Sequence, residues 1–242
     1  MTDSGDFLGL EEWDVPTHSL LLVEPDRDAD GFIPADSLPV AQAALERLAR
    51  PIGSTHTLEN LLQATVHRYP LARLAGDRVL VIETDGAHME RLLRDMESAV
   101  ARFGLQMVAQ PGAVPLAFGD ETRDFRTRTL DYEVRFASRR GVPQLLRRMA
   151  RAQETLDAQA GTGGSGMLAE FLHIASAATP GVQYIQSLYD SAAGGFEVEV
   201  RDGGPERHFR SVELDIAAAG ECFLAWMDGR RDFFGDWERM EF

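Results

Sequence analysis

The residues of this chain best suited to chemistry are its six histidines, its single cysteine and a glycine-rich stretch at 161–166. The histidines stand at positions 18, 56, 67, 88, 173 and 208, and no two of them share a metal-binding spacing such as His-x-x-x-His. One cysteine can form neither an intramolecular disulfide nor a cysteine-based zinc site. The sequence therefore predicts no metal site, and we expect no bound cofactor.

His208 is the best candidate for general acid–base catalysis. It lies on a predicted β-hairpin together with Asp202, and a neighbouring carboxylate can orient an imidazole ring. Alternation along the strand also explains His208 as an ordinary strand residue opposite an exposed arginine. The chain has no Gly-x-Ser-x-Gly nucleophile motif, and Cys222 falls within the apolar pattern of a predicted helix. Only His208 and Asp202 are thus candidate catalytic residues.

The glycine-rich stretch could bind an anion or another ligand through its backbone amides. Its candidate ligand-binding residues are Gly161, Thr162, Gly163, Gly164 and Ser165. The stretch follows a predicted helix instead of a strand, and it lacks the lysine of a phosphate-binding P-loop. A linker or a tight turn between two helices is the alternative interpretation.

The same stretch, followed by Phe171-Leu172, resembles the substrate-covering loop of the tryptophan dioxygenase family. That family is almost wholly helical and binds haem. Arg148 stands where the family's motif would place the haem-ligating histidine. We therefore expect this chain to bind no haem.

Charge limits the classes of partner. The chain carries 39 acidic residues against 24 basic ones, all arginine, for a formal net charge of −15. Such a charge repels nucleic-acid phosphate and anionic lipid, so we expect neither nucleic acids nor membrane surfaces as partners. It favours a basic protein partner, although solubility alone explains an acidic chain equally well. With no apolar leader, no long apolar run and one cysteine, a reducing, cytoplasmic location is expected.

The C-terminal residues combine aromatic rings with carboxylates. The rings belong to Trp226, Phe233, Phe234, Trp237 and Phe242, and the carboxylates to Asp228, Asp232, Asp236 and Glu238. These rings either close the core or leave an exposed aromatic patch with an acidic rim. The second interpretation makes this segment the candidate surface for a basic partner.

The apolar pattern predicts an α+β fold in two domains, 1–118 and 119–242. The first domain should begin with an acidic arm at 1–17 and continue with a strand at 20–23 and helices near 41–50 and 58–65. A hairpin at 71–82, a helix at 92–103 ended by Gly104, and a strand at 105–108 follow. This order is typical of a ferredoxin-like split βαβ unit. Prolines and glycines at 111–119 and a charged run at 120–128 mark the boundary.

The second domain should contain a strand at 132–136, a helix at 145–156 and another helix that includes Leu168, Phe171, Leu172 and Ala175. Three strands at 184–189, 196–201 and 208–214 predict an antiparallel β-meander. A final helix spans 216–227, after which Trp237 and Phe242 fold the tail back onto the sheet. His208 would then begin the third strand of the meander.

Several segments resemble small uncharacterised bacterial proteins that are grouped with toxin-immunity proteins. They are Tyr184-Ile185-Gln186, Glu199-Val200-Arg201-Asp202-Gly203, Arg207-His208-Phe209 and the ending Trp237-Glu238-Arg239-Met240-Glu241-Phe242. The end of the first half, from Gly104 to Pro111, is loosely similar to such proteins as well. The resemblance implies a non-enzymatic protein-binding module, an immunity or antitoxin protein that neutralises a basic partner such as a toxin.

Two other functions fit the residues. One is a small-molecule enzyme or sensor with a cleft near the loop at 161–166 and His208. The other is a structural subunit of a larger assembly, which an exposed aromatic tail would also serve.

Overall fold

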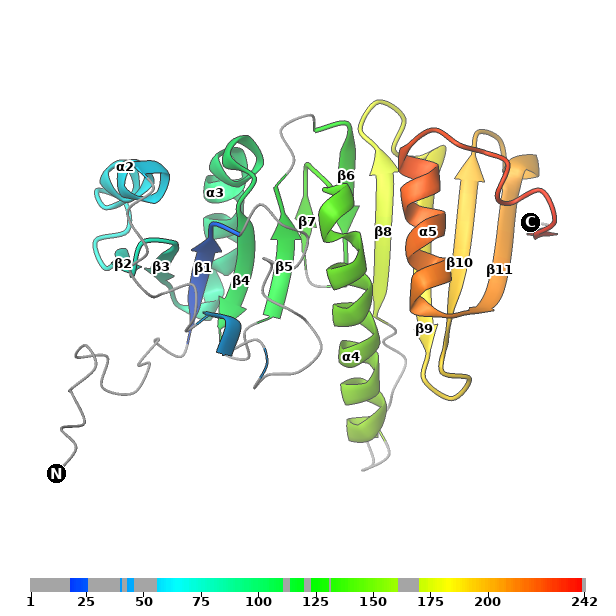
Figure 1. Ribbon diagram of the computed structural model, residues 1–242, viewed down its shortest axis with the longest axis horizontal. Coiled ribbons are helices and arrows are strands. Elements are labelled where there is room, and N and C mark those ends of the chain that lie inside the picture. The colour runs from blue at the N-terminus through cyan, green and yellow to red at the C-terminus, as the bar shows by residue number, and fades with distance from the viewer. Residues whose placement is uncertain are drawn as a thin grey trace, which may run out of the picture.

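The computed structural model describes residues 18–25, 40, 43–45, 56–110, 114–119, 123–130, 132–160 and 170–240. Two antiparallel sheets stand side by side along the molecule, and helices pack on both (Figure 1). The predicted α+β class is therefore confirmed. Within the described residues, no helix has the length and apolar character that a membrane span requires.

The first sheet has five strands in the order β2-β3-β1-β4-β5. They are β1 (Ser19–Val23), β2 (Arg73–Ala75), β3 (Val79–Glu83), β4 (Gln106–Gln110) and β5 (Val114–Phe118). The helices of this half are α2 (His56–Thr65), the short 3₁₀ helix η1 (Gly86–His88) and α3 (Met89–Phe103). All five positions of β1 are buried, because side chains of α2 and α3 cover one face of the strand and Leu45 covers the other.

The order of the strands in the first sheet can be compared with the order expected for the predicted split βαβ unit. β3 lies between β1 and β2, and β1 also pairs with β4, so β1 is central as such a unit requires. The predicted hairpin is confirmed, and α3 ends at Gly104, whose φ of 62° is favourable for glycine. β5 adds a strand that the split unit lacks, and the ferredoxin-like detail stays a prediction.

The second sheet has seven strands in the order β12-β11-β10-β9-β8-β6-β7. They are β6 (Phe125–Arg128), β7 (Glu133–Val134), β8 (Phe171–Ser176), β9 (Gln183–Asp190), β10 (Gly195–Asp202), β11 (His208–Leu214) and β12 (Glu238–Arg239). Helices α4 (Val142–Ala160) and α5 (Ile216–Met227) lie side by side on one face (Figure 1), and η2 (Arg139–Gly141) and η3 (Pro205–Arg207) are short 3₁₀ turns. The predicted meander is confirmed as β9, β10 and β11.

One element was predicted wrongly. Residues 171–176 form the strand β8, where a helix was expected, and Leu168 lies outside the described residues. Leu172 and Ile174 face the core, whereas Phe171 and His173 are only partly buried, which is the alternation of a strand with one apolar face. Pairing with β6 on one side and β9 on the other satisfies the backbone of β8 and overrides its helix-like spacing of apolar residues.

The segment predicted to mark the domain boundary, residues 111–128, contributes strands to both sheets. β5 contains Pro115 and stands at an edge of the first sheet, where a missing N–H is tolerated, and the charged run supplies β6. Side chains also cross the predicted boundary: Phe118 packs in the core of the second half, whereas Val134 and Phe136 pack in that of the first. The division into two domains stays a prediction.

Candidate functional site

The second sheet has one face that no described helix covers, and we call it the open face. Ile185, Val198 and Val200 point toward α4 and α5. Because side chains alternate along a strand, their neighbours point the other way. Strand register pairs Tyr184 with Arg201, Arg201 with His208, and Gln186 with Glu199. Polar side chains from three adjacent strands are thus brought together on the open face.

These side chains line a pocket of about 470 Å³, which we call the His208 pocket. Its lining residues are Tyr184, Gln186, Glu199, Arg201, Pro205, His208 and Met240. His208 is buried, and its Nε2 atom lies 3.3 Å from Oε2 of Glu199. Nε2 of Gln186 donates a hydrogen bond of 2.6 Å to the same oxygen. The hydrogen bond from the amide holds the Glu199 carboxylate in place, and the imidazole lies beside the same oxygen.

Tyr184 forms an aromatic wall of the pocket. Its ring centroid lies 5.9 Å from that of His208 in an edge-on arrangement and 4.9 Å from that of His173 on β8. Burial raises the pKa of the Tyr184 phenol, while a hydrogen bond with Arg201 acts in the opposite direction. The hydroxyl therefore keeps its proton at neutral pH and can both donate and accept hydrogen bonds.

The groups of this pocket can recognise charge and hydrogen-bonding groups, and its imidazole can also accept or donate a proton. An imidazole, a carboxylate, a phenol and a guanidinium converge there, whereas no serine, threonine or cysteine is among the lining residues. Cys222 lies on α5, packs at the edge of the core between the helices and the sheet, and has a thiol pKa raised to about 11 by burial. It is thus protonated at neutral pH and is a poor nucleophile.

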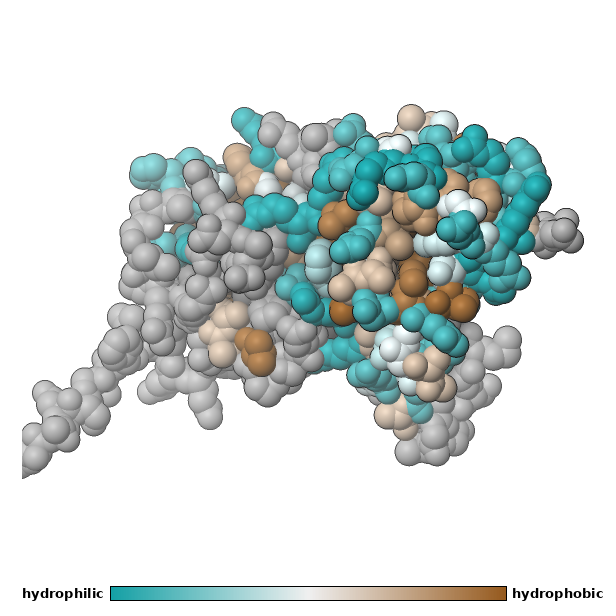
Figure 2. Space-filling view, turned by 45° about the vertical axis from the view of Figure 1, so that its right-hand side comes forward, coloured by the Kyte–Doolittle hydropathy of each residue, from teal (hydrophilic) through white to brown (hydrophobic). Residues whose placement is uncertain are grey.

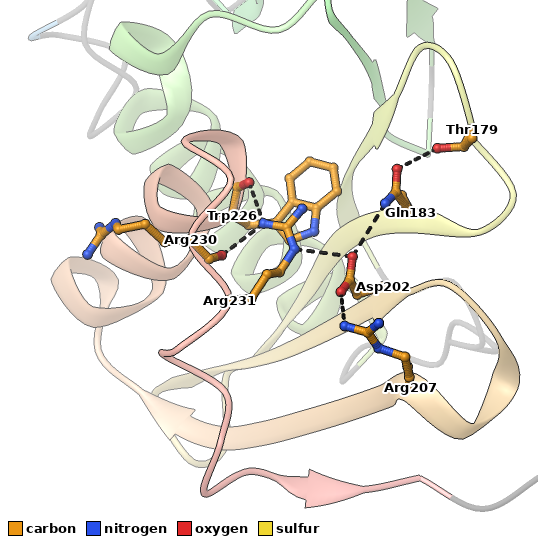
Figure 3. Close-up of polar contacts among 7 residues, drawn as sticks. All are labelled: Thr179, Gln183, Asp202, Arg207, Trp226, Arg230 and Arg231. Atoms are coloured by element: carbon orange, nitrogen blue, oxygen red, sulfur yellow. Dashed lines mark hydrogen bonds and ion pairs between the residues drawn. The ribbon is translucent and has the colours of Figure 1, made fainter.

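Asp202, the carboxylate predicted beside His208, faces the helices instead (Figure 3). Its Oδ1 atom lies 3.2 Å from Nε of Arg231 and accepts a 3.4 Å hydrogen bond from Gln183, while Oδ2 pairs with Arg207. Nη1 of Arg231 in turn donates to the backbone oxygen of Trp226 at 2.9 Å. Asp202 therefore fastens the segment after α5 to the sheet, and Glu199 is the carboxylate beside His208.

Two of the aromatic rings of the C-terminal segment close the core. Trp226 and Phe234 are buried, and Phe234 stacks on Phe209 with ring centroids 4.8 Å apart. Phe233 and Trp237 are half-buried and meet edge to face at 5.4 Å. Only these two rings can contact a partner directly, and Phe242 lies outside the described residues.

The carboxylates of this segment differ in their surroundings. Asp228 pairs with Arg139 at 2.8 Å, and Glu238 pairs with Arg210 at 2.8 Å. Asp232 and Asp236 are exposed, and neither forms an ion pair with a described residue. We call Asp232, Phe233, Asp236 and Trp237 the tail surface.

The predicted ligand-binding residues Gly161, Thr162, Gly163, Gly164 and Ser165 lie outside the described residues. Among the described residues, no group of three or more histidine, cysteine or acidic side chains is arranged to hold a metal ion.

Comparison of the chain with protein-family models, with curated proteins and with solved structures finds no significant match.

Proposed function

We propose that this chain is a non-enzymatic protein-binding module that neutralises a basic protein, in the manner of an immunity or antitoxin protein. The tail surface is the observation that supports it most directly. Asp232 and Asp236 are exposed and flank the half-buried rings of Phe233 and Trp237. Carboxylates beside aromatic rings suit arginine and lysine side chains, which pair with the former and pack over the latter.

The distribution of charge supports the same partner chemistry. Residues 213–238 hold seven acidic residues and two arginines, and the first 36 residues hold ten acidic residues and one arginine. A basic protein would be attracted at long range by this excess, which raises its rate of association. The attraction weakens with salt, because the Debye length falls from about 10 Å at 0.1 M to about 3 Å at 1 M.

Apolar residues near the tail surface add contact area. α5 exposes Ala217 and leaves Cys222 and Leu224 only partly buried, and its outward side carries few charges. On this side of the molecule, hydrophobic residues lie in patches within a mainly hydrophilic surface (Figure 2). A central apolar contact with a charged rim is the usual anatomy of a specific protein interface.

The test compares capture by matched variants. Tagged protein is incubated with a lysate of the cells that encode it, beside Asp232→Asn/Asp236→Asn and the control Glu59→Gln/Glu90→Gln. The control removes two exposed charges from α2 and α3, in the first half of the chain. We expect the unmodified chain and the control to retain one stoichiometric basic protein that the tail variant loses.

The captured protein then allows a kinetic test. Its rate of association should fall steeply between about 0.1 M and 1 M salt, because the long-range attraction is screened. A rate that is independent of salt, or equal capture by the tail variant and the control, would contradict the proposal. Recovery of the chain alone would contradict it too.

A further inference from the structure

The His208 pocket holds two opposite charges on one strand. Glu199 and Arg201 are separated by one residue on β10 and therefore project from the same face of the sheet. The contacts of the Glu199 carboxylate with His208 and Gln186 use Oε2, and the carboxyl group of Glu197 lies within hydrogen-bonding reach of Glu199 as well. Among the described residues, no ion pair joins Glu199 to Arg201. The two charges stand beside each other without cancelling by direct contact.

This balance selects the charge of a ligand. A simple anion would pair with Arg201 but would be repelled by Glu199. A simple cation would pair with Glu199 but would be repelled by Arg201. A charge that enters a partly buried site without a partner is costly. A molecule that carries one positive and one negative group can satisfy both side chains at once.

The rest of the pocket fits a small apolar group. The Tyr184 ring, Pro205 and Met240 supply its apolar walls. Its volume of about 470 Å³ falls within the range of about 300–1,000 Å³ that is typical of small-molecule sites. A zwitterionic head near Glu199 and Arg201 would leave the remainder of such a molecule against these walls.

We propose that the His208 pocket binds a free α-amino acid. Its carboxylate pairs with the Arg201 guanidinium, its ammonium group donates to the Glu199 carboxylate, and its side chain packs against Tyr184 and Met240. Gln186 is a positioning residue, because its hydrogen bond holds the Glu199 carboxylate toward the ligand, and His208 lies beside the same oxygen. None of the tail-surface residues lines the pocket, so this proposal does not depend on protein binding.

The first experiment measures the rise in melting temperature with each of the twenty common α-amino acids, followed by calorimetry on the best one. At least one amino acid should bind saturably with a Kd below about 1 mM. Its N-acetyl and carboxamide derivatives, which each lack one charge, should bind at least about tenfold more weakly, because a hydrogen bond to a charged group is lost.

Variants identify the site. Glu199→Gln and Arg201→Met should each weaken binding at least about tenfold, whereas Arg201→Lys keeps the charge and should retain part of the affinity. The matched controls are Glu90→Gln and Arg102→Met, which change exposed charges on α3, in the first half of the chain. Both controls should bind as tightly as the unmodified chain. The melting temperature without ligand reports whether each variant is folded.

Three results would overturn the proposal. One is the absence of saturable stabilisation by any amino acid. Another is equal binding of the N-acetyl or the carboxamide derivative, which would show that only one charge is recognised. The last is unchanged binding by folded Glu199→Gln and Arg201→Met variants.

Discussion

The buried ion pair between Arg148 and Glu170 offers a direct test of the second half of the fold. Nη1 of Arg148, in the middle of α4, lies 2.9 Å from Oε1 of Glu170, just before β8, and the two side chains are only 6% and 3% exposed. The guanidinium also lies over the Tyr132 ring, 5.3 Å from its centroid. The pair thus links α4 to the residue before β8, and it contacts Tyr132, which packs in the core of the first half.

The expected cost follows from this burial. Removing one partner of a buried pair leaves an uncompensated charge and lowers the free energy of unfolding by about 3–5 kcal/mol. At about 2–4 °C per kcal/mol for a chain of this size, Glu170→Gln or Arg148→Met should lower the melting temperature by about 6–20 °C. Replacing both residues with methionine removes both charges and should cost less than either single change.

Urea unfolding followed by circular dichroism measures these free energies. Asp228→Asn is the matched control, because it also turns a paired carboxylate into an amide, but at a site that is 50% exposed and 2.8 Å from Arg139. Its cost should stay below about 1 kcal/mol. The reasoning is refuted if Glu170→Gln costs no more than this control, or if the double variant is as unstable as the two single costs combined.

Three further predictions concern single side chains. Asp202→Asn should weaken the attachment of the segment after α5 and lower the free energy of unfolding by about 1–3 kcal/mol. Trypsin should then cleave faster after Arg230 and Arg231. An unchanged cleavage rate would contradict the role assigned to Asp202. Burial, assisted by the positive charge of Arg128, lowers the pKa of His173 below the ordinary value of 6.5. The unfolded chain therefore binds more protons than the folded one as the pH falls through 6.5, so stability should decrease there, and His173→Gln should flatten that pH dependence in urea unfolding. Cys222, with a thiol pKa of about 11, should react with iodoacetamide far more slowly in the folded protein than in urea at neutral pH, and equal rates would show that the thiol is not protected.

The sequence predicts those elements whose apolar residues mark one face. α3, α5 and the strands β9 to β11 follow a single period each, and the structure has all of them near the expected bounds. β8 was missed because Phe171, Leu172 and Ala175 also fit a helical spacing. β6 was missed because it has only four residues, in which Phe125 and Thr127 alternate with two arginines. An alternation of this length is too short to predict a strand.

The site was predicted in part. His208 was named, but its carboxylate neighbour is Glu199 and not Asp202. The strand register explains this difference, because β11 pairs His208 with Arg201. Glu199 is the next residue of β10 on the same face as Arg201 and therefore approaches the His208 ring. Asp202 lies on the other face and points to the helices. A slip of one residue would exchange the two faces, and register across a turn that contains η3 depends on backbone geometry that residue types alone do not specify.

Salt separates the two proposed binding activities, because they depend on charge in different ways. On the open face, carboxylates and arginines nearly balance: Arg210 lies 3.6 Å from Glu197 and 2.8 Å from Glu238, and the His208 pocket holds one acidic and one arginine side chain. Most of the excess that makes the net charge −15 therefore lies elsewhere, on surfaces where screening acts at long range. Protein association should thus weaken with salt, whereas a zwitterion held by two adjacent charges should bind almost as well at 1 M salt as at about 0.1 M.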